Sequence, residues 1–178
     1  MPRPDAAMDR FVGFGAVVGA LGGALRIVAA FIPYDPAVVW LEALYAACDL
    51  GMMFGLIAVY VAVAEQLGIA GMATFAVALA ALASIVGPDA PAFGVDFYRA
   101  GAAVFALALA AFAVTLLVAR RLTLASVLWI TCAAFGLVAS ATGNAPAFVG
   151  AGLALGAGFI VAGVTVFRSL RLKEGAAV

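Results

Sequence analysis

Histidine is absent from this 178-residue chain, and lysine occurs once, at Lys173. The lack of histidine excludes His-ligated haem, His-dependent zinc sites and Ser-His or Cys-His catalysis. A retinal Schiff base is excluded as well, because the single lysine lies in the C-terminal tail. The two cysteines, Cys48 and Cys132, lie in apolar runs, where a free cysteine behaves as a small hydrophobic residue. We therefore predict no cofactor and no metal site.

Charge is also scarce. Charged residues make up 10% of the chain and hydrophobic residues 68%, with a mean hydropathy of +1.26. Soluble domains are typically about half apolar and about a quarter charged. The composition therefore predicts an integral membrane protein whose main partner is the lipid bilayer, and nothing in it suggests a nucleic-acid partner.

Six apolar segments are long enough to cross a bilayer as helices, which takes roughly 20 residues each. The connections after the first, third and fifth contain proline, glycine, aspartate or asparagine, as in "IPYDP", "GPDAPAFGVD" and "TGNAP". We predict an all-α bundle of six transmembrane helices that forms a single transmembrane domain over residues 1–178. The predicted spans are 11–32, 37–64, 69–87, 98–119, 123–142 and 147–167.

Basic residues gather on one side of this six-span arrangement. The other side holds only Arg99, together with Asp35, Asp89 and Asp96. Basic loops stay in the cytoplasm, so we predict that both termini are cytoplasmic and that the protein is a multi-pass protein of a plasma membrane of the bacterial inner-membrane type. The basic residues on the cytoplasmic side would be Arg3, Arg10, Arg120, Arg121, Arg168, Arg171 and Lys173.

Three charges interrupt the first two spans, at Arg26, Glu42 and Asp49. Helical rise places Arg26 and Glu42 at a similar depth, roughly 8–10 Å below the outer edge of the hydrocarbon, and predicts an ion pair between them. Asp49 follows Glu42 by seven residues, which returns it to within about 20° of the same helix face, with Tyr45 between. These four residues form the predicted buried polar site. Hydroxyl partners considered for Asp49 are Tyr45, Thr74, Ser84, Thr115, Thr131 and Ser140.

Glycines recur at four-residue spacing in several spans, which creates grooves where a second helix can approach closely. Packing within one chain is the favoured interpretation, and a homodimer or another membrane protein is the alternative. The predicted helix-packing residues are Gly15, Gly19, Gly23, Gly51, Gly55, Gly152 and Gly156.

Motifs of membrane enzymes are missing: there is no G-x-S-x-G elbow and no glycine-rich phosphate loop with a lysine. Catalysis is therefore not favoured. One hypothesis is a small transporter or channel for an unidentified ion or solute, with a proton-responsive acidic site. The other is a non-transporting subunit, scaffold or regulator that binds a membrane protein through its glycine faces. An outer loop with Asp89 and Asp96 could serve as a vestibule or a simple solvated turn.

Overall fold

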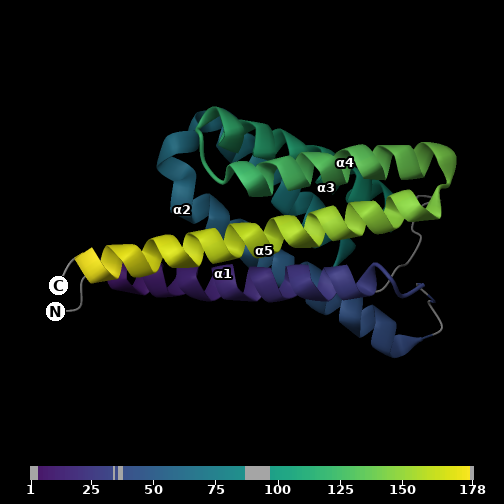
Figure 1. Ribbon diagram of the computed structural model, residues 1–178, viewed down its shortest axis with the longest axis horizontal. Helices are drawn as coiled ribbons and strands as arrows, with labels where there is room; N and C mark the ends of the chain where they lie inside the picture. Colours follow the sequence, from purple (N-terminus) through teal and green to yellow (C-terminus); the bar gives the residue numbers. More distant parts are fainter. Residues whose placement is uncertain (1–3, 34, 36–37, 87–96, 177–178) are drawn as a thin grey trace.

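The computed structural model describes residues 4–33, 35, 38–86 and 97–176, and this part of the chain contains five helices and no strand (Figure 1). Each helix is long and apolar enough to cross a membrane. An all-helical, multi-pass architecture therefore agrees with the sequence. The helices are α1 (Pro4–Ala29), α2 (Val39–Ile85), α3 (Phe97–Val118), α4 (Thr123–Thr142) and α5 (Ala145–Ala176).

Helix α2 differs most from the prediction, because its 47 residues cover most of both the second and the third predicted span. The expected break around 65–68 is reduced to Gly68, whose φ of 60° and ψ of −165° are not helical. Glu65, Gln66 and Leu67 are good helix formers and continue the helix up to that glycine. The two arms of α2, 39–67 and 69–85, fold back on each other, since Tyr60 and Phe75 stack with ring centroids 4.0 Å apart.

The helices pack in a ring. Helix α1 contacts α2 and α5, α3 contacts α2 and α4, and α4 contacts α5, while α2 also touches α5 across the ring. The start of α1 and the end of α5 lie at one end of the molecule, at the left of Figure 1. The end of α1 and the connection between α4 and α5 lie at the other end. This second end holds the polar residues of the predicted site.

Close backbone contact joins α1 to its neighbours at glycines. A Cβ on Gly22 would lie 2.8 Å from the backbone nitrogen of Met52, and Gly19 faces Gly55 in the same way. Gly15 lies against Ala58. Among the remaining predicted packing residues, Gly51 faces Gly22, Gly23 and Gly156 face each other, and Gly152 lies against Ala30. These glycines therefore hold α1 tightly between α2 and α5 within one chain.

Short polar caps fix the connection between α4 and α5. Gly143 ends α4 in the left-handed conformation, φ 67°, and its N–H donates to the carbonyl of Ala139 at 2.8 Å. Asn144 then caps the start of α5, because its side-chain oxygen accepts a hydrogen bond from the N–H of Ala147 at 3.2 Å. Glycine and asparagine favour these two positions. The two caps fix the start of α5, and Phe148 and Gly152 lie in its first two turns.

Candidate functional site

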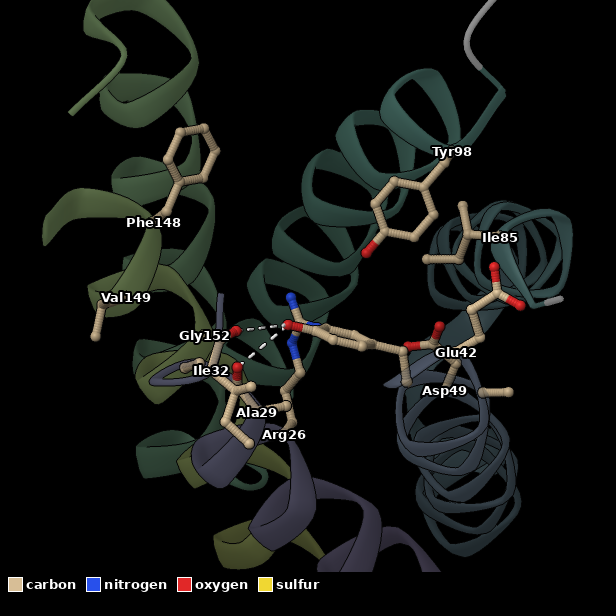
Figure 2. Close-up of a pocket in the computed structure, with 13 residues that line it drawn as sticks. Arg26, Ala29, Ile32, Glu42, Asp49, Ile85, Tyr98, Phe148, Val149 and Gly152 are labelled. Carbon is tan, nitrogen blue, oxygen red and sulfur yellow. Dashed lines mark hydrogen bonds between the residues drawn. The ribbon is translucent and has the colours of Figure 1, made fainter. Parts of the chain in front are cut away.

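A cavity of about 420 Å³ lies between the last turn of α1, the start of α2, the end of its second arm, and the starts of α3 and α5 (Figure 2). All four residues of the predicted polar site line it: Arg26, Glu42, Tyr45 and Asp49. The tertiary structure also brings Ile85, Tyr98, Phe148 and Gly152 to this cavity, from helices that are distant in sequence. The four polar residues therefore share one space rather than lying on separate faces.

Tyr45 connects α2 to the end of α1. Its hydroxyl donates to the carbonyl oxygen of Ala29 at 3.2 Å and lies 3.5 Å from that of Ile32, as Figure 2 shows. The last carbonyls of a helix have no partner within the helix, so the phenol satisfies part of this need. The ring of Tyr45 is thereby held at a fixed place in the cavity.

Arg26 lies over that ring, with the guanidinium carbon 5.2 Å from the ring centroid. This distance is within the range of a cation–π interaction. Arg26 also belongs to the last turn of α1, where the helix dipole favours a positive charge. Its Nε is buried and makes no hydrogen bond to the described part of the chain.

The predicted ion pair between Arg26 and Glu42 is not formed: neither residue makes a salt bridge to the other among the described residues. The guanidinium turns toward the Tyr45 ring, whereas Glu42 projects on the side of the cavity nearer Ile85 (Figure 2). The equal depth of Arg26 and Glu42 in neighbouring helices predicts that the two residues lie close together. It could not predict which side chain the guanidinium would contact, since that depends on the direction of each side chain.

Asp49 is the most deeply buried charged residue of the site, with 4% of its surface exposed. Within the described residues its carboxylate makes no hydrogen bond and no ion pair, although Arg26 is close enough for its charge to act on it. A buried carboxylate without a partner is costly. Asp49 therefore presents an unsatisfied acceptor to the cavity.

The hydroxyls considered as partners of Asp49 are mostly used elsewhere. Tyr45 donates to α1, and four others donate to carbonyls of their own helices at 2.7–2.9 Å: Thr74 to Ala70, Ser84 to Ala81, Thr115 to Phe112 and Thr131 to Val127. A hydroxyl has one proton to give, so none of these can also donate to Asp49. Ser140 instead lines another cavity, which adjoins the first.

A second cavity of about 550 Å³ adjoins the first and is bordered by α3, α4 and α5. Arg26, Asp49 and Tyr98 line both cavities, so this arginine and this aspartate lie where the two meet. Glu42 lines only the first cavity and Arg99 only the second. Most of the second cavity is apolar. Its lining includes Met52, Phe105, Leu137, Phe148 and Leu155.

An aromatic layer closes the bundle beneath both cavities. We use this name for Tyr60, Phe75, Phe112, Trp129 and Phe159, whose neighbouring rings have centroids 4.0 to 6.5 Å apart. In α2, α3, α4 and α5 the layer residue lies further toward the end where α1 begins than the residues lining the cavities. The cavities are therefore separated from that end by packed rings.

Sequence reasoning missed three contributors to the site: Tyr98, Phe148 and Cys132. Tyr98 projects into the first cavity toward Arg26 (Figure 2), and Cys132 lines the second cavity. In the sequence, Tyr98 and Phe148 are aromatic residues near the ends of predicted spans. That position is equally typical of an aromatic belt at the membrane interface, so it does not indicate a site. The predicted outer loop at 87–96 lies outside the described residues.

Comparison of the chain with protein-family models, with curated proteins and with solved structures finds no match.

Proposed function

We propose that this protein is a small transporter of a plasma membrane of the bacterial inner-membrane type, and that Asp49 is its ligand- or proton-binding group. The observation that carries the proposal is Asp49, which is 4% exposed, has no ion pair or hydrogen bond to the described residues, and lies at the junction of two cavities. Ionisable residues inside membrane bundles commonly mark ion, proton or substrate pathways.

The proposed topology has six spans, with the two arms of α2 as separate crossings. At about 1.5 Å per residue, 47 residues in one straight helix would far exceed a hydrocarbon core of about 30 Å. The two ends of the chain and the connection between α3 and α4 carry seven basic residues, which favours the cytoplasm for that side. The cavities would then face the outside.

Proton sensitivity of the site would depend on the groups that surround Asp49. These are Arg26 from α1, Glu42 and Tyr45 from α2, Tyr98 and Arg99 from α3, and Cys132 from α4; α5 contributes no titratable side chain to either cavity. Arg26 is the cation whose charge acts on Asp49. Protonation of Asp49 would leave this cation without its opposing charge.

The aromatic layer supports a carrier over an open channel. It blocks the route from the cavities to the cytoplasmic side, so passage requires the helices around it to move. The alternative function, a scaffold that binds through glycine faces, receives less support because those glycines pack inside the chain.

Proton flux into proteoliposomes with an internal pH dye and an imposed gradient tests the proposal. We expect flux with the native chain and background flux with Asp49→Asn, whose side chain has a similar shape but does not titrate. Glu65→Gln is the matched control, because Glu65 is exposed and lines neither cavity. Background flux with the native chain, or equal flux with Asp49→Asn, would contradict a proton-coupled carrier.

A further inference from the structure

Two opposite charges share the cavities without pairing. Arg26 and Asp49 come from neighbouring helices and line both cavities, yet no ion pair joins them within the described residues. The guanidinium is instead held over the Tyr45 ring, and the Tyr45 hydroxyl is fixed to the end of α1. The two charges are therefore kept apart by the packing of α1 on α2.

Each charged side chain has a polar atom without a hydrogen-bond partner in the described part of the chain. The Nε of Arg26 is a buried donor without a hydrogen bond. The Asp49 carboxylate belongs to a residue that is only 4% exposed and makes no hydrogen bond to the described residues. A simple cation would satisfy Asp49 but would be repelled by Arg26, and a simple anion would have the opposite problem. A ligand that carries one charge of each sign satisfies both residues and adds no net charge to the site.

The lining of the second cavity indicates the chemistry of the uncharged part of such a ligand. The second cavity, of about 550 Å³, begins at Arg26 and Asp49 and continues between apolar side chains such as Phe105, Leu137 and Leu155. Ligand pockets of this size typically combine apolar walls with a few polar groups that orient the ligand. An apolar group attached to the charged part would extend into this cavity.

We propose that the ligand is a small zwitterion with an apolar body, which has the chemistry of a hydrophobic α-amino acid. Its carboxylate binds Arg26, since guanidinium matches carboxylate geometry, and its ammonium group binds Asp49. Its side chain occupies the second cavity. This inference rests on the proposed function, because it names the substrate class of the same site.

Calorimetric titration of the purified full-length protein in detergent, with four probes, tests the inference. Leucine carries both charges and an apolar body, leucine amide lacks the carboxylate, N-acetylleucine lacks the ammonium group, and glycine lacks the apolar body. We expect leucine to bind about tenfold or more tightly than each of the other three, because a buried charge left unpaired is strongly penalised.

Charge-specific variants make the test sharper. Arg26→Gln should abolish the preference for leucine over leucine amide, and Asp49→Asn should abolish the preference for leucine over N-acetylleucine. Each variant should leave the other preference in place, which a general loss of folding would not do. Glu65→Gln should bind all four probes as the native chain does, since Glu65 lies outside both cavities.

Occupancy of the second cavity can be followed at Cys132, which lines it, in a Cys48→Ala background. Leucine should slow the reaction of Cys132 with a small thiol reagent, and glycine should not. No leucine binding to the folded native chain, or equal binding of leucine and leucine amide, would overturn the inference. If proton flux nevertheless depends on Asp49, the proposed function stands and only the substrate class is wrong.

Discussion

At the scale of single residues, Tyr45 organises the site. Its hydroxyl is committed to the end of α1, and its ring carries the guanidinium of Arg26. The aromatic ring thus offers Arg26 a contact that competes with Asp49. Asp49, although deeply buried, makes no ion pair with Arg26 in the described part of the chain, and the guanidinium lies over the Tyr45 ring instead.

Replacing Tyr45 separates these two roles. Tyr45→Phe removes the hydrogen bond to Ala29 but keeps the ring, so we expect a loss of about 1 kcal/mol in stability and little change in flux. Tyr45→Leu also removes the ring, which frees Arg26 to pair with Asp49, and flux should fall. Thermal unfolding in detergent and proteoliposome flux measure the two effects. Equal flux for both variants would show that the ring does not hold the charges apart.

At the scale of elements, glycine determines how close the helices come and where α2 turns. Gly22 faces the backbone of Gly51 and Met52 without room for a side chain, whereas Gly13 on the same helix has its nearest neighbour, Leu170, at 3.7 Å from an added Cβ. These two glycines therefore differ in packing although both are helical.

Gly22→Ala should lower the stability by about 1–3 kcal/mol, because backbone atoms cannot move away from the new methyl group. Gly13→Ala should instead leave the stability unchanged or raise it by up to about 1 kcal/mol, since alanine is the better helix former. Thermal unfolding of both variants in the same detergent provides the comparison. An unchanged melting temperature for Gly22→Ala would rule out the tight α1–α2 contact.

Gly68 and Gly136 form a second pair. Neither has an atom within 4 Å of an added Cβ, but Gly68 has a φ of 60° and Gly136 lies within α4 without a positive φ. Gly68→Ala should cost about 1–3 kcal/mol through backbone strain, while Gly136→Ala should be neutral or stabilising. The measurement is again thermal unfolding, and tolerance of Gly68→Ala would mean that the turn in α2 does not need this conformation.

At the scale of the whole molecule, the ring of helices has a polar, hollow end, and the aromatic layer separates this end from the other one. Exposed apolar side chains such as Phe14, Leu21 and Ile69 lie on its outer surface, where lipid would cover them. Because the two ends differ, the proposed topology places the cavities on one side of the membrane, the outside.

Cysteine labelling in a Cys48→Ala, Cys132→Ala background tests this topology. A membrane-impermeant maleimide added to intact cells should label Ala145→Cys, at the start of α5. It should label Gln66→Cys and Arg121→Cys only after lysis, because the turn of α2 and the connection between α3 and α4 would face the cytoplasm. Labelling of Gln66→Cys in intact cells would contradict the six-span arrangement.

The amino-acid sequence by itself determined the all-helical, membrane-type architecture, because length and hydropathy act locally along the chain. It also indicated that Arg26, Glu42, Tyr45 and Asp49 gather at one place, since helical rise and periodicity fix depth and face. Only the tertiary structure decided that Arg26 contacts Tyr45 rather than Glu42, and that Tyr98, Cys132 and Phe148 complete the cavities. The reason is physical: side-chain direction and the neighbours of each helix depend on how the whole ring packs, and periodicity within one helix carries no information on that packing.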